Sequence, residues 1–291
     1  MERGAVGPEV VVCGPASWNQ MVDLDVLPRP EPHMVFARGA HETVGGTSAG
    51  KALHLVDLGR SVLLHTVVGD DERGRLVLDA LGKAGVAVDA VVADGPTERH
   101  LNLMDAHGGR VSLYLDVPPA DASPPGPELT SALAGARVAV MDLSDRSRAL
   151  LPAVAETGLP VWTDVHDYNG TDDYHRPFLA AASHVFMNAD RQPDPVGFLH
   201  RLVDEGAMLA VCTLGASGAV AVSAGHAEHR VAAVPVAEVV DTNGAGDAFM
   251  AGVLAATLDG CDVDDALRAG ARQAARALGT RHLSPLLDAA T

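Results

Sequence analysis

The residues best suited to chemistry lie in one short run near the C-terminal end of the chain. Asp241 and Asp247 flank the small-residue turn 242–246, and a helix-forming run follows from Ala248 to Leu258. The β-branched pair Val239-Val240 predicts the end of a strand before the turn. Where a glycine turn opens a helix, free N–H groups and the positive end of the helix dipole converge, so this turn is expected to bind an anion. A carboxylate in a first helical turn is usually a cap, but a second carboxylate across the turn favours proton transfer instead.

This run resembles the C-terminal signature of ribokinase-like (PfkB-type) sugar and nucleoside kinases, Asp-Thr-x-Gly-Ala-Gly-Asp. The resemblance implies that Asp247 activates the acceptor hydroxyl, and that the amides of Gly244, Ala245 and Gly246 hold the γ-phosphate of ATP. These four are the predicted catalytic residues. Asn243 is the form associated with adenosine kinases, which keeps a nucleoside acceptor open beside a sugar.

Two further elements resemble the nucleotide side of the same family. The segment 210–218 resembles its Thr-Leu-Gly-x-x-Gly element, whose Thr and Gly border the phosphates and ribose of ATP. Asn188 matches the first residue of its Asn-x-x-Glu pattern, which orders the water around Mg²⁺, but Arg191 replaces the Glu. Because Mg²⁺ relies on outer-shell oxygens to fix its waters, Asp190 is predicted to supply the missing oxygen through water. The residues predicted to bind the nucleotide are Asn188, Thr213, Gly215, Gly218, Asp241, Thr242 and Asn243.

Residues 45–52 carry two competing signals. Gly45, then four residues, then Gly50 and Lys51 resemble the start of a P-loop. A P-loop needs Ser or Thr next and follows a buried strand, whereas Ala52 comes next here and the preceding stretch is polar and turn-like. The segment is more similar to the Gly-Gly signature of the ribokinase-like family, which leads into a helix and packs against the acceptor. Gly50 stands where that family has Asn, so Lys51 is expected either to fill the space or to be a solvated helix residue.

The remaining acceptor contacts are expected from a small sheet that acts as a lid. Alternation from Gln20 to Val26 predicts one strand, and residues 100–115 predict a hairpin with its turn at 106–109. Ser17 and Asn19 stand where the family has residues that bind acceptor hydroxyls, with plain turn residues as the alternative. For Asn102 in the hairpin, burial in the strand core is the alternative. The residues predicted to bind the acceptor are Ser17, Asn19, Gly45, Gly46, Gly50, Lys51, Asn102 and Asp247.

Strand and helix patterns alternate along the rest of the chain. Short apolar runs such as Val10–Cys13 and 138–143 predict buried strands, separated by stretches with helical patterns. Alternation of this kind implies parallel βαβ units. With the resemblance, the predicted class is α/β, a ribokinase-like three-layer α/β/α fold with a central mostly parallel sheet and a small β-sheet lid. A single domain is expected over 1–291, with the lid inserted as about 16–44 and 97–118.

Composition limits the partners and the compartment. The net charge of −17 argues against nucleic acids and anionic membranes, although local N–H groups and a metal can still hold ATP. Cys13, Cys212 and Cys261 are far apart and odd in number, which is typical of a reducing compartment. Because neither a secretory segment nor a run of about 20 apolar residues is found, a cytoplasmic protein is expected.

The resemblance implies an ATP-dependent kinase that phosphorylates a hydroxyl, usually a CH₂OH, of a sugar or sugar derivative. Its expected cofactors are ATP and Mg²⁺, with room for a monovalent cation such as K⁺. A homodimer through the exposed edge of the lid is also expected. Two alternatives stay open. An adenosine-type nucleoside kinase is indicated by Asn243 and the neutral Asn19, and an impaired sugar- or nucleotide-binding sensor by Arg191, although the intact Asp247 argues against a sensor.

Overall fold

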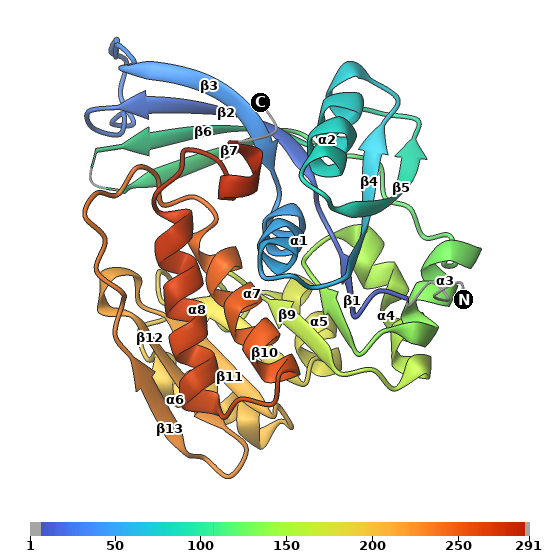
Figure 1. Ribbon diagram of the computed structural model, residues 1–291. Coiled ribbons are helices and arrows are strands. Elements are labelled where there is room, and N and C mark those ends of the chain that lie inside the picture. The colour runs from blue at the N-terminus through green and yellow to red at the C-terminus, as the bar shows by residue number, and fades with distance from the viewer. Residues whose placement is uncertain (1–6, 107, 289–291) are drawn as a thin grey trace.

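The computed structural model describes residues 7–106 and 108–288 (Figure 1). The large sheet contains β1 (Val10–Cys13), β4 (Val62–Gly69), β5 (Ala87–Ala93), β8 (Val138–Met141), β9 (Val161–Asp164), β10 (His184–Asn188), β11 (Leu209–Thr213), β12 (Ala219–Ser223) and β13 (Glu228–Val231). The small sheet contains β2 (Ser17–Leu24), β3 (Gly39–Gly45), β6 (Arg99–Asp105) and β7 (Arg110–Asp116). The α-helices are α1 (Thr47–Asp57), α2 (Glu72–Lys83), α3 (Pro127–Gly135), α4 (Asp145–Thr157), α5 (Arg176–Ala181), α6 (Pro195–Asp204), α7 (Ala245–Leu258) and α8 (Val263–Ala277).

The large sheet reverses its strand order near the middle. The order is β13-β12-β11-β10-β9-β8-β1-β4-β5, with β12 and β13 as antiparallel additions to a parallel sheet. From β1 the chain builds outward to β4 and β5, then returns to the other side of β1 and builds from β8 to β11. The reversal therefore falls between β1 and β8. Ligands of open α/β sheets bind outside the carboxyl ends of the strands at such a point.

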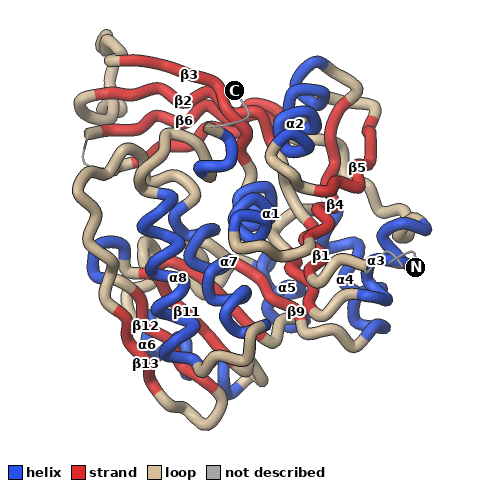
Figure 2. The backbone as a smooth tube through the Cα atoms, viewed as in Figure 1, coloured by secondary structure: helices blue, strands red, loops and turns tan. Residues whose placement is uncertain are grey.

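Alternate residues of the central strands pack against helices on opposite faces, as the two-residue period of a strand requires. Val10 and Val12 of β1 join a core with α1, α2, α7 and α8, whereas Val11 and Cys13 join a second core with α3, α4 and α5. Helix α6 packs against β11 and β12. Figures 1 and 2 show the resulting layers of helix, sheet and helix. The predicted three-layer class is confirmed, and the strands are apolar on both faces because both faces are covered.

The small sheet has the order β3-β2-β6-β7 and forms the upper left of the view in Figure 1. Strand β6 buries alternate residues, whereas β7 is an exposed edge strand. At the hairpin between them, Arg110 Nη1 donates a hydrogen bond to Asn243 Oδ1 at 3.1 Å, so the lid touches the turn that precedes α7. Of the predicted hairpin turn, His107 lies outside the described residues. That the chain is one domain with an inserted lid stays a prediction.

The predicted strand end at Val239-Val240 is wrong. These residues belong to no strand, and they are 52% and 48% exposed. The N–H of Val240 donates to the carbonyl of Leu278 at 2.8 Å, which fixes the segment as a connection along the end of α8. β-Branched residues favour strands only where the surrounding sheet offers them neighbours to pack against. Helix α7 accordingly begins at Ala245, earlier than the predicted start at Ala248.

The lid strands also differ from their predicted bounds. Strand β2 begins at Ser17, so Ser17 and Asn19 are strand residues and not turn residues. Strand β3 was not predicted, because its outer half is polar and exposed and only its last three residues are buried. Helices α3 and α6 were likewise not predicted. In the described part of the chain, every helix is too short or too polar to span a membrane.

Candidate active site

The turn at 242–246 forms the N-terminal end of α7, as an anion site requires. Gly244 caps the helix with a φ of +77°, a conformation that glycine adopts without steric cost. Within the described residues no side chain caps this helix. The N–H of Ala245 donates to the carbonyl of Thr242 at 3.4 Å, whereas those of Gly246 and Asp247 stay available to a ligand. Asp241 Oδ1 accepts a hydrogen bond from the N–H of Asn243 at 2.8 Å, and burial raises the pKa of Asp241.

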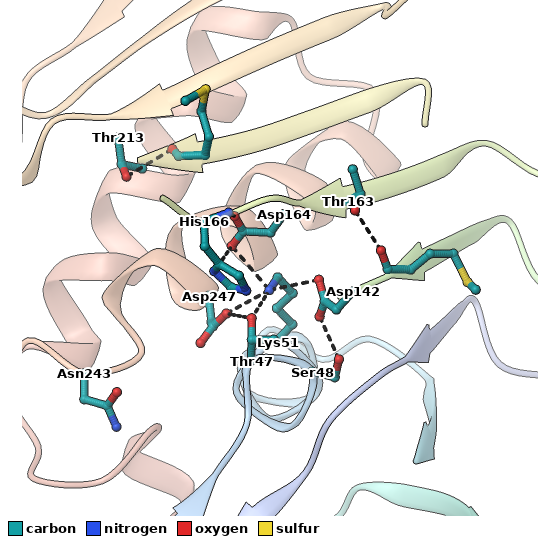
Figure 3. A network of polar contacts seen from close by, with 12 residues as sticks. Thr47, Ser48, Lys51, Asp142, Thr163, Asp164, His166, Thr213, Asn243 and Asp247 are labelled. Atoms are coloured by element: carbon teal, nitrogen blue, oxygen red, sulfur yellow. Dashed lines mark hydrogen bonds and ion pairs between the residues drawn. The ribbon is translucent and has the colours of Figure 1, made fainter. Parts of the chain in front are cut away.

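Asp247 lies in the first turn of α7, with its side chain 12% exposed. Its Oδ1 is held from two sides, because Thr47 Oγ1 donates a hydrogen bond to it and Lys51 Nζ lies 2.8 Å away (Figure 3). Its Oδ2 lies close to Gly50, 2.8 Å from the point that a Cβ would occupy there. The two carboxylate oxygens therefore have different surroundings, and the missing side chain at Gly50 makes room for Oδ2.

The ammonium of Lys51 is the centre of a buried ion cluster. Nζ lies 2.8 Å from Asp247 Oδ1, 3.2 Å from Asp142 Oδ1 and 3.5 Å from Asp164 Oδ2, and the lysine side chain is 1% exposed. Burial lowers the pKa of Lys51, but the three carboxylates outweigh burial and raise it above its ordinary value. The lysine is therefore an ammonium ion at any physiological pH.

Asp142 and Asp164 lie at the carboxyl ends of the adjacent parallel strands β8 and β9. Ser48 Oγ donates to Asp142 Oδ2 at 2.7 Å, and burial raises the pKa of Asp142. Burial also favours a raised pKa for Asp164, but His166 and Lys51 outweigh it and hold the pKa below its usual range. Neither aspartate was predicted as a site residue. A signal was available, because Asp142 lies near the end of the predicted strand 138–143, Asp164 closes the next apolar run, and parallel strands end at one edge.

This cluster corrects one expectation for Lys51. It is not a solvated helix residue, because its side chain is buried among three carboxylates. A role for Lys51 in acceptor binding stays a prediction. The ammonium also cannot serve a P-loop, because carboxylates occupy the place of phosphates around it. The stretch before Gly45 is strand β3 and not the predicted polar turn, but Ala52 still provides no hydroxyl for a metal.

The predicted acceptor residues of the lid meet where β2 pairs with β3. Ser17 lies opposite Gly45, and Asn19 lies opposite Thr43. Ser17 Oγ donates to Asn19 Oδ1 at 2.8 Å, and both side chains are buried. Strand β3 ends at Gly45, and the next residue, Gly46, leads into α1, the helix that carries Gly50 and Lys51. The structure thus connects the lid residues to the ion cluster through one short segment.

Strand β6 contributes Asn102 on its buried face. The side chain is 3% exposed, and its Nδ2 lies 3.3 Å from Met21 Sδ of the neighbouring strand. On the same face the ring of His100 contacts that of Tyr114 at a tilt of 43°, with ring centroids 3.9 Å apart, and His100 Nε2 lies 2.9 Å from Glu98 Oε1. A role for Asn102 in acceptor binding stays a prediction.

The predicted nucleotide residues follow the carboxyl ends of β10 and β11. Asn188 and Thr213 are the last residues of these parallel strands and are direct register partners. Gly215 and Gly218 bound the 3₁₀ turn after β11, and both have positive φ. Strands β8, β9, β10 and β11 end at one edge, so this region continues the edge that carries the Lys51 cluster, as Figure 3 shows for Thr213.

The metal prediction concerns Asn188, Asp190 and Arg191. Asn188 Oδ1 accepts a hydrogen bond from the N–H of Asp190 at 3.0 Å, and Asp190 is exposed. Arg191 Nη1 lies 3.7 Å from Asp167 Oδ2, so a carboxylate partly balances its charge. Residues 7–106 and 108–288 contain no group of three or more side chains suited to hold a metal. Magnesium that keeps its waters and binds substrate phosphates needs only one or two protein oxygens, so the role of Asp190 stays a prediction.

Comparisons with known proteins identify the family. Residues 10–289 match the model of the pfkB family carbohydrate kinases. The chain belongs to this family. It is 30% identical over 267 residues to the acarbose 7(IV)-phosphotransferase of Actinoplanes sp., over 90% of this chain and 89% of that relative. The solved structure of a microbiome-derived acarbose kinase superimposes with a TM-score of 0.82 at 32% identity, over 94% of this chain and 93% of that one.

A more distant structure supports the fold. The ribokinase of Arabidopsis thaliana, solved with ribose and ATP, has a TM-score of 0.75 at 22% identity and covers 98% of this pfkB-family chain and 97% of its own. The predicted resemblance and the ribokinase-like class are confirmed. Membership in this family also confirms the predicted enzyme class, an ATP-dependent sugar kinase that uses an alcohol group as acceptor.

Proposed function

We propose that this pfkB-family protein transfers the γ-phosphoryl group of ATP to a hydroxyl, usually a CH₂OH, of a sugar or sugar derivative, and that Asp247 is the base. The observation that carries this proposal is the position of Asp247. Its carboxylate lies in the first turn of α7, whose N–H groups have no side-chain cap in the described structure. A proton acceptor and an anion site thus lie within one helical turn, which is what transfer of a phosphoryl group to a hydroxyl needs.

The proposed step is in-line transfer. Asp247 Oδ2 accepts the proton of the acceptor hydroxyl, and the acceptor oxygen bonds to the γ-phosphorus as the bond from phosphorus to the leaving oxygen of ADP breaks. The backbone N–H groups of 244–247 neutralise the negative charge on the transferring oxygens. Phosphoryl transfer depends mainly on positioning and electrostatic stabilisation, so these few groups are sufficient.

The nucleotide and metal assignments belong to the same proposal. Asn188, Thr213, Gly215, Gly218 and the segment 241–243 border ATP. Bound Mg²⁺ would neutralise charge on the ATP phosphates. Asn188 and Asp190 would fix the waters of that ion. Activation by K⁺, a homodimer through the lid edge and a cytoplasmic location stay predictions.

The acceptor is proposed to be a neutral polyhydroxyl compound. Ser17, Asn19 and Asn102 offer hydrogen bonds without charge, and Gly50 offers none from a side chain. The two relatives named for acarbose make acarbose-like oligosaccharides candidates beside monosaccharides. An adenosine-type nucleoside stays the alternative acceptor, on the same grounds of Asn243 and the neutral Asn19.

A panel experiment tests the proposal. Release of ADP is measured with ATP, Mg²⁺ and one acceptor at a time, including acarbose, maltose, ribose, fructose 1-phosphate and adenosine. Turnover with a sugar and none with adenosine is the expected result. Turnover with adenosine alone would favour the nucleoside kinase. Binding of ATP or a sugar without any turnover would favour the sensor.

A further inference from the structure

We propose that Lys51 is a positioning residue for phosphoryl transfer: its ammonium fixes Asp247 Oδ1 and thereby presents Oδ2 to the acceptor hydroxyl. This inference rests on the proposed function, because it assigns Asp247 as the base. Lys51 itself touches neither substrate. It acts from behind the carboxylate, within the buried cluster seen in Figure 3.

The first support is the division of contacts on Asp247. Oδ1 receives Thr47 Oγ1 and Lys51 Nζ, both from the first two turns of α1. Oδ2 lies close to Gly50, on the same helix, where no side chain competes for space. One oxygen is therefore held by two donors, while the other has room left for a hydroxyl. Helix α1 supplies both the donors and the space, so its geometry sets the orientation of a carboxylate on α7.

The second support is how Lys51 is itself held. Asp142 has 0% side-chain exposure, and Ser48 occupies its Oδ2. Its Oδ1 has no hydrogen-bond partner in the described structure, so the ammonium at 3.2 Å is the group that balances it. Asp164 adds a third carboxylate at 3.5 Å. Asp142 and Asp164 thus hold the end of the flexible lysine side chain in place. Because the ammonium is fixed by these two carboxylates, it can in turn fix the orientation of Asp247.

Lys51 could instead serve only as a counter-ion to the buried carboxylates, and an experiment can separate this structural role from the positioning role. If Lys51 only balances buried carboxylates, replacing one of them by a neutral amide should make the lysine dispensable. If Lys51 positions Asp247, the same compensation should restore the fold but not the turnover. Lys51→Met keeps an unbranched side chain, one atom shorter than lysine, while removing its charge and donors. Lys51→Met combined with Asp142→Asn then removes one charge of each sign.

The experiment compares wild type, Lys51→Met and the double variant. Lys83→Met is the matched control, because Lys83 is exposed and pairs with the exposed Asp79 on the same helix. Thermal unfolding, ATP affinity, kcat and acceptor KM are measured for each. We expect the single variant to unfold at a lower temperature and the double variant to recover most of that loss. The kcat of the double variant should stay about 100-fold below wild type, the loss typical of a reacting group misplaced by about 1 Å, with ATP affinity within about twofold.

Two results would overturn the inference. A folded double variant with kcat within threefold of wild type would show that Lys51 is a counter-ion alone. Lys51→Arg provides the second readout, because it keeps the charge while its planar guanidinium places the donors elsewhere. A folded Lys51→Arg enzyme with the kcat of wild type would likewise contradict a positioning role for Lys51. Absence of wild-type turnover on the whole acceptor panel would instead overturn the proposed function, and the positioning role with it.

Discussion

Replacement of Asp247 by Asn tests its role as a base separately from its structural contacts with Thr47 and Lys51. The Oδ1 contacts with Thr47 and Lys51 can survive in an amide, but the Nδ2 that replaces Oδ2 carries two hydrogens and cannot accept a proton. Loss of a general base lowers kcat by about 10² to 10⁴, which corresponds to roughly 2.7 to 5.4 kcal/mol of activation free energy. The variant should therefore bind ATP and acceptor normally and turn over slowly.

Stability provides an internal control for this variant. Around Lys51 three carboxylates face one ammonium, so a neutral residue at 247 removes excess negative charge from a buried cluster. Thermal unfolding of Asp247→Asn should consequently occur at or above the wild-type temperature. The assay is steady-state ADP release with calorimetric titration of ATP. A folded, ATP-binding variant with kcat within threefold of wild type would refute the assignment of Asp247 as the base.

Three further predictions concern neighbouring residues. Lys51→Ala should leave ATP affinity unchanged in a direct titration, because carboxylates and not phosphates surround the ammonium; a large loss of affinity would revive the P-loop. Gly50→Ala should lower kcat about 100-fold by displacing Asp247 Oδ2, which lies 2.8 Å from the new methyl group, whereas the control Gly82→Ala meets nothing within 4 Å and should keep full activity. Asp190→Ala should raise the Mg²⁺ concentration for half-maximal rate severalfold, while Arg191→Glu should be tolerated or lower it; a Mg²⁺ dependence that ignores Asp190 would contradict its role.

The contiguous part of the site could be predicted from the sequence. Asp241, the glycines of the turn and Asp247 lie within seven residues. Local rules for helix N-termini predict an anion site there, and the resemblance to the ribokinase-like family implies that Asp247 is the base. Asn188 and Thr213 could also be placed at strand ends, because the apolar runs before them are clear. The alternation of strands and helices predicted parallel βαβ units, and the resemblance to the ribokinase-like family added the three-layer class.

The contacts of Lys51 could not be predicted, because its partners come from distant parts of the chain. Only the strand order brings Asp142 and Asp164 beside α1, and nothing near Lys51 in sequence marks it as buried. The missed strand β3 and the false strand at Val239-Val240 have one cause. Strand formation depends on neighbours in the sheet, which a polar segment can have and an apolar segment can lack.

Phosphorus NMR of the reaction products tests the central claim most directly. Wild-type protein is incubated with ATP, Mg²⁺ and each acceptor of the panel, and Asp247→Asn is run in parallel. The expected result is a phosphomonoester signal of a sugar that grows as ADP forms, and that is nearly absent with Asp247→Asn over the same time. Formation of ADP with inorganic phosphate and no sugar phosphate, or equal sugar phosphate from both proteins, would contradict the account.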